Sequence, residues 1–344
     1  MRLSLGEART FVERVLLAAG ARQDDAEIMA RALVEAEHAG HAGHGLARLS
    51  GYVGRLRAGG TRSVNWTRVR SHGAVESYDG RDGLGHVHLE RAIARAAELC
   101  ADHGIAAVGV SHSNHAGALG PRARRLAEGG LVALLATNAP AVLAPPGGRR
   151  AVVGTNPLAV AAPVPGGPPL VCDVSTSQVS RGAIMRAAQR GSEIPSGWAL
   201  DAAGLPTQDP TAALAGTLMP LGGPKGFVLA LAVEVLTGAL LGPAVGQEVQ
   251  DFFGDSLDRP QGIAHLVLAL DPARFGEATA FSARMGRLRD AVLGAGEPQA
   301  TRLPGARAVA HAARQGDAVE VDDELLGMLS GLAAEVGTQP LISD

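Results

Sequence analysis

The sequence predicts an α/β fold in which helices flank a central sheet. Apolar positions recur at helical spacing through the first 60 residues, and helical patterns return near the C-terminus. Between them, short apolar runs typical of strands alternate with amphipathic helical stretches. A chain of 344 residues with 46% hydrophobic and 19% charged residues can bury a large core, so the composition is that of a globular protein.

The elements follow in order along the chain. Ser4 and Glu7 have the spacing of a capping box, and they precede the first of three expected N-terminal helices, at about 5–19, 24–38 and 45–58. Strands are expected at about 75–78, 105–110, 131–137, 152–162, 170–174 and 265–270. Further helices are expected at about 88–103, 120–128 and 322–336, and after the Asp209–Pro210 pair.

Charge and cysteine usage limit the partners and the compartment. The net charge is -3 without a basic footprint, so nucleic acid and anionic membranes are not expected as partners. The most apolar stretch, 227–241, is shorter than the roughly 20 residues that span a bilayer, and we expect a buried helix there. Cys100 and Cys172 lack CxxC spacing, and the N-terminus has no signal-peptide pattern, so a reducing, cytoplasmic location is expected.

Lysine and asparagine are scarce in this chain. Of the 31 Lys and Arg residues one is lysine, Lys225, and the asparagines are Asn65, Asn114, Asn138 and Asn156. A coding bias explains the scarcity, and it also makes the remaining residues candidates for specific chemistry.

The segment HAGHAGHGLARL holds the first candidate site. His38, His41 and His44 are each three apart, which suggests zinc, but these positions do not share one helix face, so no metal site is expected. His44 and Arg48 are four apart and share a face if a helix begins near residue 43. An imidazole that exchanges a proton beside a guanidinium that holds a carboxylate suits oxo-acid reduction. On spacing alone, two surface side chains remain the alternative.

Three further segments carry polar residues at the edge of the predicted sheet or in turns. In VGVSHSNHAGALG, a strand runs into Asn114 and His115, at the usual ligand-binding edge of an α/β sheet. The turns around 138 and 155–156 and the segment 173–177 offer amides and hydroxyls that suit ribose and phosphate oxygens. Ordinary turn chemistry remains the alternative for each.

The segment MPLGGPKG predicts an anion site at a helix N-terminus. Gly223 allows close backbone approach, Pro224 can open a helix, and Lys225 lies at the positive end of that helix. The spacing is not that of a Walker A loop, and no GxGxxG followed by a suitable helix occurs. The alternative is a solvated lysine at a helix start.

Together these segments resemble the malate/L-lactate dehydrogenase-like oxidoreductases, a family that includes ureidoglycolate and sulfolactate dehydrogenases, diketogulonate reductase and the cyclic imino acid reductases. The similarity runs in the family's order through HGLARLSGYVGRLRAGG, SNHAGALG, GTNPLAVAAP, CDVSTSQ, MPLGGPKG and RLPGARA, and covers nearly the whole chain. It implies a mixed central sheet flanked by helices, a nicotinamide-binding fold distinct from the Rossmann domain, with the N-terminal helical part joined by the C-terminal segment.

The resemblance also implies roles for individual residues. His44 is implied as the proton donor or acceptor, with Arg48 and His115 beside it. The expected cofactor is NAD or NADP, and the substrate is a small carboxylate. The implied cofactor contacts are Asp173, Val174, Ser175, Thr176, Ser177, Pro224, Lys225, Gly305, Ala306 and Arg307. The turns and the helix start described above add Asn138, Thr155, Asn156 and Gly223 to the expected cofactor contacts.

The resemblance further implies a homodimer whose active site lies close to the subunit interface. We expect residues 1–118 with 301–344 to form a substrate and dimerisation domain, and 119–300 to form the cofactor-binding domain.

The predicted function is an NAD(P)-dependent interconversion of a 2-oxo acid and its 2-hydroxy acid by hydride transfer. One alternative is reduction of pyrroline- or piperideine-2-carboxylate. Gly43 argues against it, because it replaces the family's serine and removes a hydroxyl implied in the imino acid reductases. Pro121 and Ala306 also depart from the family pattern, where an aromatic residue and a glutamate are common. An inactive cofactor-binding sensor is the alternative of another class.

Overall fold

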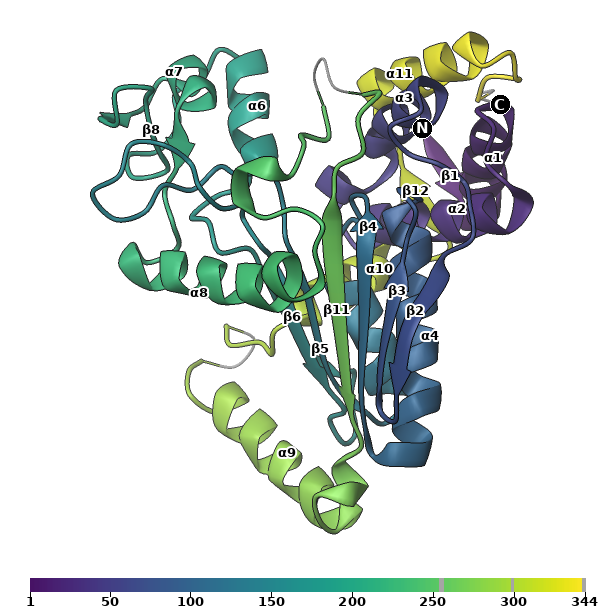
Figure 1. The fold of residues 1–344 in the computed structure, drawn as a ribbon, viewed down its shortest axis with the longest axis vertical. Coiled ribbons are helices and arrows are strands. Elements are labelled where there is room, and N and C mark those ends of the chain that lie inside the picture. Colours follow the sequence, from purple (N-terminus) through teal and green to yellow (C-terminus); the bar gives the residue numbers. More distant parts are fainter. Residues whose placement is uncertain (254–256, 298–299, 342–344) are drawn as a thin grey trace.

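A seven-stranded sheet forms the centre of the molecule in the computed structural model, which describes residues 1–253, 257–297 and 300–341 (Figure 1). β3 and β4 are parallel, and every other neighbouring pair is antiparallel. The predicted mixed sheet is therefore confirmed. In spatial order the strands are β2 (Thr67–His72), β3 (Val75–Asp79), β4 (Ile105–Ser113), β11 (Ile263–Leu270), β5 (Val132–Thr137), β6 (Leu158–Ala162) and β7 (Leu170–Val174).

Two helices cover one face of this sheet with a shared apolar core. They are α4 (Gly85–His103) and α5 (Gly120–Glu128). Leu89 and Leu126 of these helices join Val108 and Val267 of the strands, all at most 3% exposed. β11 lies between β4 and β5, so this core joins strands that are far apart in the sequence.

The N-terminal helices pack with the C-terminal segment, as expected. Leu33 and Tyr52 share one buried cluster with Val319 and Leu329. Strand pairing between the two ends of the chain adds to this packing, and the capping box at Ser4 forms as predicted. The elements are β1 (Arg2–Ser4), α1 (Leu5–Ala18), α2 (Gln23–His38), α3 (Leu49–Ala58), β12 (Ala318–Glu320) and α11 (Asp323–Glu335).

A third group of elements lies across the molecule from the N-terminal helices (Figure 1). Its apolar core includes Leu143, Ile184 and Phe227. The elements are α6 (Arg181–Gln189), β8 (Ala199–Leu200), β9 (Pro206–Thr207), α7 (Pro210–Ala215), β10 (Thr217–Leu218) and α8 (Pro224–Glu234), which continues into a π-turn (Val235–Ala239). Two further helices, α9 (Ala278–Leu293) and α10 (Ala306–Gln315), follow β11. None of the described helices could cross a membrane on length and apolarity.

Several sequence expectations need correction. A single helix over 45–58 is wrong, because two short 3₁₀ turns, Ala42–His44 and Leu46–Arg48, precede α3. Gly45 lies between the turns, where a Cβ atom would come within 2.1 Å of the Glu37 carboxylate. The expected strand at 152–162 begins only at Leu158 as β6, and β2 was missed because its residues are all exposed and so carry no apolar pattern.

The expected burial of the helix over 227–241 is also wrong. Phe227 and Val233 face the interior, but Val228 is 63% exposed and Leu240 is 64% exposed. A helix that is apolar on all sides is expected to be covered on all sides, and within the described part of this single chain one side of α8 is uncovered.

The expected domain boundary falls inside the central sheet. β2, β3 and β4 belong to residues 1–118, whereas β5, β6, β7 and β11 belong to residues 119–300. The two parts therefore share one sheet, and their division into a substrate domain and a cofactor domain stays a prediction.

Candidate active site

His44, Arg48 and His115 come together at one place. The His44 and His115 rings stack with centroids 5.6 Å apart and planes 16° apart. Arg48 contributes to the electrostatic environment of both rings. The 3₁₀ turns place His44 and Arg48, whereas His115 follows β4, so the juxtaposition arises from the tertiary fold and not from one helical turn.

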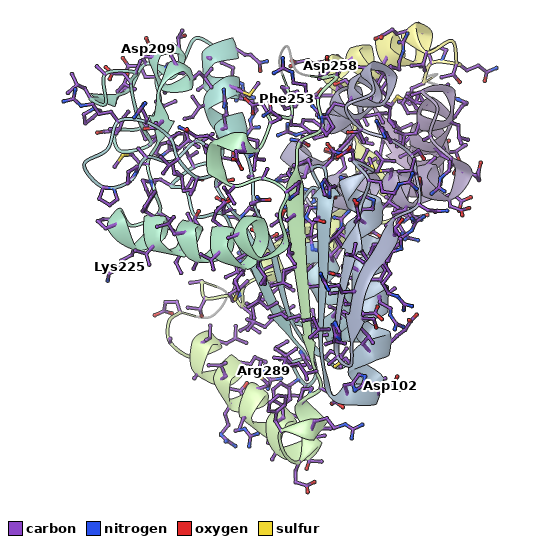
Figure 2. The ribbon with its side chains drawn as sticks, in the orientation of Figure 1. Asp102, Asp209, Lys225, Phe253, Asp258 and Arg289 are labelled. Atoms are coloured by element: carbon purple, nitrogen blue, oxygen red, sulfur yellow. The ribbon has the colours of Figure 1, made fainter. Side chains whose placement is uncertain are left out.

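The Arg48 side chain is fixed through its Nε atom, whereas its two terminal nitrogens are available to a ligand. Its Nε donates to the Gly43 carbonyl at 2.6 Å, and its guanidinium lies 4.7 Å from the Phe253 ring centroid. Figure 2 shows Phe253 in the region between α6 and the N-terminal helices. No acceptor for the two terminal nitrogens of Arg48 occurs among residues 1–253, 257–297 and 300–341, so they are available to a carboxylate.

A buried chain of hydrogen bonds leads to His115. Tyr52 Oη lies 2.6 Å from His115 Nδ1 and 2.7 Å from His86 Nε2. The Arg122 guanidinium donates to the other His86 nitrogen, Nδ1. We call Arg122, His86, Tyr52 and His115 the buried relay.

The donors of the buried relay fix the tautomer of His115. Arg122 can only donate, so His86 Nδ1 accepts, and the neutral His86 ring carries its proton on Nε2 and donates it to Tyr52. The single Tyr52 proton is then donated to His115 Nδ1. His115 in its neutral form therefore carries its own proton on Nε2, where no described residue accepts it.

Burial keeps these groups neutral. It lowers the pKa of His44 to about 4, with the positive charge of Arg48 as the second cause. Burial also lowers the pKa values of His86 and His115 well below the usual range, and it raises the pKa of the Tyr52 phenol. His44 Nδ1 is buried without a hydrogen-bond partner among the described residues. An unpaired buried nitrogen is costly, so His44 is set to receive a proton or a ligand hydrogen bond.

The polar loop of His115 is held in place by its neighbours. Gln261 accepts from the His115 backbone N–H at 2.9 Å, and Asn114 donates to the carbonyls of Asp82 and Gly83. Asn114 therefore orients the loop. The strand before it, β4, extends to Ser113 and not only to residue 110 as expected, so His112 lies in its last part.

The expected cofactor segments meet around the end of β7. Thr176 bonds the Thr155 carbonyl through its backbone N–H and its hydroxyl, both at 2.8 Å, and its own carbonyl accepts from the N–H of Leu221, just before α8. Asp173 accepts from the Gly120 N–H at the start of α5. The Pro304 carbonyl, in the turn before Gly305, accepts from the Val171 N–H in β7.

The hydroxyls of this loop differ in availability. Ser175 and Ser177 lie 3.2 Å apart through their hydroxyl oxygens, and Ser177 donates to the Val179 carbonyl. Val174 is 48% exposed. Ser177 thus has two internal hydrogen bonds through its hydroxyl, and Ser175 has one.

The start of α8 has the geometry of an anion cradle. Gly222 and Gly223 have φ values of 61° and 68°, and a Cβ atom at either would meet nothing within 4 Å. Pro224 opens the helix, and the side chain of Lys225 points outward from it (Figure 2). Open backbone and a lysine at a helix N-terminus suit a phosphate.

Two other expected cofactor contacts are internal. Asn138 and Asn156 are at most 1% exposed, and their amides donate to the buried Glu234 carboxylate at 3.3 and 2.7 Å. Their side chains therefore hold the loops that present Thr155. At the second expected turn, Gly305 caps α10 with a φ of 86°, followed by Ala306 and the exposed Arg307. Direct cofactor contact by any of these residues stays a prediction.

Sequence reasoning missed three members of the buried relay. Tyr52 is one of two tyrosines in the chain, so the scarcity argument that singled out asparagine and lysine could have found it. His86 and Arg122 carry no comparable signal, because only the packing of α4 against α5 brings them together. Among the described residues, no group of three or more His, Cys, Asp or Glu could hold a metal ion.

Comparison with known proteins defines the class. The family model described as malate/L-lactate dehydrogenase matches residues 3–330. The chain is 41% identical over 331 residues to the (2R)-3-sulfolactate dehydrogenase (NADP(+)) of Chromohalobacter salexigens, covering 96% of this chain and 98% of that one. It is 35% identical to a Delta(1)-pyrroline-2-carboxylate reductase of Ancylobacter novellus, covering 85% and 84%.

Solved structures agree with this result. The sulfolactate dehydrogenase of Methanocaldococcus jannaschii superposes with a TM-score of 0.90 at 29% identity, over 98% of each chain. A fold and site of this kind define a nicotinamide-dependent oxidoreductase. The chain belongs to the malate/L-lactate dehydrogenase family, which confirms the predicted family, fold class and enzyme class.

Proposed function

We propose that this chain interconverts a small 2-oxo acid and its 2-hydroxy acid with NAD or NADP. The observation that carries the proposal is the unpaired, buried Nδ1 of His44, in a ring that stacks on His115 and lies beside the open end of Arg48. A proton-exchanging imidazole and a guanidinium that can hold a carboxylate are the two groups that this reaction requires.

Each of the three residues has one role in the proposal. Arg48 binds the substrate carboxylate with its two terminal nitrogens. His44, neutral at pH 7 in the absence of substrate, accepts the hydroxyl proton during oxidation and returns it during reduction. His115 donates its Nε2 proton to the same oxygen, because the buried relay keeps Nδ1 occupied, and so holds the reacting carbon in one orientation.

The cofactor site is proposed around the end of β7 and the start of α8. When bound there, the nicotinamide group supplies or accepts the hydride. Gly223, Pro224 and Lys225 would hold a phosphate at the N-terminus of α8, and Thr155, Ser175 and the backbone of 173–177 would hold the ribose. The open backbone at Gly223 supports this assignment.

A second candidate is reduction of a cyclic imine next to a carboxylate. Relatives named as pyrroline-2-carboxylate reductases are 35% identical to this chain, which favours considering it. The same Arg48 and His44 would serve, since a C=N group also takes up a hydride and a proton. Gly43 stands against it, because no side chain lies at the position of the implied serine.

We further propose a homodimer. Val228, Leu231, Val235 and Leu240 expose apolar surface along α8 and the π-turn that follows it. Within α9, only Gly286 is buried, and Figure 1 shows this helix extending away from the central sheet. A second copy of the chain would cover such surfaces. The free thiols of Cys100 and Cys172 accord with the proposed reducing, cytoplasmic location.

A substrate panel tests the proposed function. NADH and NADPH are supplied in parallel with pyruvate, oxaloacetate, sulfopyruvate and piperideine-2-carboxylate, and the loss of nicotinamide absorbance is followed. We expect turnover of at least one 2-oxo acid, faster than that of the cyclic imine. Turnover of the imine alone would establish the second candidate, and no turnover of any compound would indicate an inactive cofactor-binding protein.

A further inference from the structure

A second cation lies beside Arg48 on a separate element. A Cβ atom on Gly182 would lie 3.8 Å from Arg48 Nη2 and 3.6 Å from Arg186 Nη1. The two guanidinium groups are therefore no farther apart than the sum of these distances. Arg186 is one turn after Gly182 on α6, so both positions occupy the helix face that approaches Arg48.

Neither guanidinium has a carboxylate partner in the described part of the chain. The nearby Arg181 pairs with Asp251 at 3.6 Å, whereas no ion pair occurs for Arg48 or Arg186 among residues 1–253, 257–297 and 300–341. Two unpaired like charges this close repel each other. Burial first, and then the charge of Arg186, lowers the pKa of Arg48. An anion between them would relieve this repulsion.

We propose that Arg186 binds a second anionic group of the substrate, so that this enzyme prefers a dianion, a 2-oxo acid with a second carboxylate or a sulfonate, over a monoanion. The inference rests on the proposed function, because it assumes that Arg48 holds the first carboxylate. A four-carbon dicarboxylate or a three-carbon sulfo-carboxylate is short enough to bridge two guanidinium groups at this separation. Guanidinium forks suit both carboxylate and sulfonate oxygens.

The proposed site distinguishes dianions from monoanions because its two guanidinium groups come from different parts of the molecule. Arg48 lies between α2 and α3, whereas Arg186 lies on α6 across the molecule. A monoanion would contact Arg48 and leave Arg186 exposed to water. A cyclic imino acid has an apolar ring at the position of the second anionic group, so it offers no partner to the Arg186 guanidinium.

Kinetics with a matched pair of variants tests the inference. Arg186→Gln should lower kcat/KM for oxaloacetate and sulfopyruvate by about tenfold to a hundredfold, mainly through KM, while kcat/KM for pyruvate changes by less than about threefold. Arg190→Gln removes the same charge at the end of α6 and should leave both values unchanged. Equal losses for dianions and pyruvate in Arg186→Gln would contradict the inference.

Binding without turnover separates this inference from the proposed function. Malonate, a dianion that cannot be reduced, should raise the melting temperature of the wild-type protein more than acetate at equal ionic strength. Arg186→Gln should abolish the difference and Arg190→Gln should keep it. If malonate and acetate act alike on the wild type, the second anion site is wrong even when 2-oxo acids are turned over. If malonate is preferred but no oxo acid reacts, the proposed reaction fails and the anion site stands.

Discussion

In the proposed function, Tyr52 determines through which nitrogen His115 donates a proton to the substrate. Its hydroxyl is the link between the donors on the Arg122 side of the buried relay and His115 Nδ1. Without this link, the neutral His115 ring could carry its proton on either nitrogen, and only one of the two tautomers would donate through Nε2. We therefore propose Tyr52 as a positioning residue, which works through His115.

Tyr52→Phe is expected to lower kcat by about tenfold to a hundredfold, the usual loss for a residue that orients an active-site group. KM should change little, because Arg48 still holds the carboxylate. Tyr78→Phe removes the chain's other tyrosine hydroxyl, which bonds Glu76, and should leave kcat unchanged. Steady-state kinetics with circular dichroism as a folding control would decide. A Tyr52→Phe enzyme with unchanged kcat would remove the orienting role.

The lowered pKa of His44 predicts the pH dependence of oxidation. As the base, His44 must be neutral, and its pKa of about 4 leaves it neutral at pH 6 and above. The plot of kcat/KM against pH reports the free enzyme. Scaled to the folded fraction measured by circular dichroism at each pH, kcat/KM should therefore stay level down to about pH 5 and fall only near pH 4. A fall centred near pH 6.5 would mean that the base titrates as an ordinary histidine.

The limits of sequence reasoning are visible at single residues. His44, Arg48 and His115 were predicted and lie together, but the expected cause, one helical face, is wrong for the first two. Arg186 had no signal in a chain with 30 arginines, because only its distance to Arg48 distinguishes it. Residue type and spacing identify candidates, whereas tertiary contacts select among them.

At the scale of elements, periodicity predicted most strands and helices whose apolar side faces a core. α5 and β7 begin and end at the expected residues. β2 escaped prediction because its residues are all exposed. For α8 the sequence predicted the helix but wrongly predicted its full burial, since one side lies open in the single chain.

Val235→Glu is therefore expected to convert a dimer into monomers, because it places a charge in the exposed apolar surface formed by α8 and the π-turn that follows it. The wild type should have twice the chain mass of 35.0 kDa in light scattering after size exclusion. Leu205→Glu changes a residue of similar exposure, 62% against 60%, in the turn between β8 and β9, and should leave the dimer intact. A wild type that is monomeric at micromolar concentration, or a dimeric Val235→Glu, would show that α8 is not the interface.

At the scale of the whole molecule, the candidate site lies where three parts of the fold meet. The N-terminal helical part provides His44 and Arg48, the loop after β4 provides His115, and α6 provides Arg186, the proposed second anion site. The sheet that both expected domains share fixes the loop of His115 relative to the others. Because the site depends on this sheet, activity should be lost at the same pH or temperature at which the whole molecule unfolds.

Six buried or half-buried histidines make stability depend on pH. Their pKa values in the folded chain lie below the unfolded value of 6.5: His41, His44, His86, His88, His115 and His265. The unfolded chain binds more protons below pH 6.5, so the stability they contribute is present above that pH and is lost as pH falls. Each contributes a slope of up to about 1.4 kcal/mol per pH unit.

The melting temperature is expected to fall steeply between pH 6.5 and pH 4.5 in scanning calorimetry. His88→Asn keeps a polar group near Ser113 but removes one titration, so its slope should be shallower than that of the wild type. His103→Gln, at the exposed end of α4, should keep the wild-type slope. A melting temperature that is constant across this range would contradict the neutral state of these histidines.

The turnover of His44→Ala tests the central claim, that His44 exchanges the proton with the substrate. The variant should retain its melting temperature and its quenching of NAD(P)H fluorescence, and its kcat should fall by about a hundredfold or more on the best 2-oxo acid. His41→Ala, three residues earlier, should keep kcat within about threefold of the wild type. A folded, cofactor-binding His44→Ala with wild-type kcat would contradict the claim.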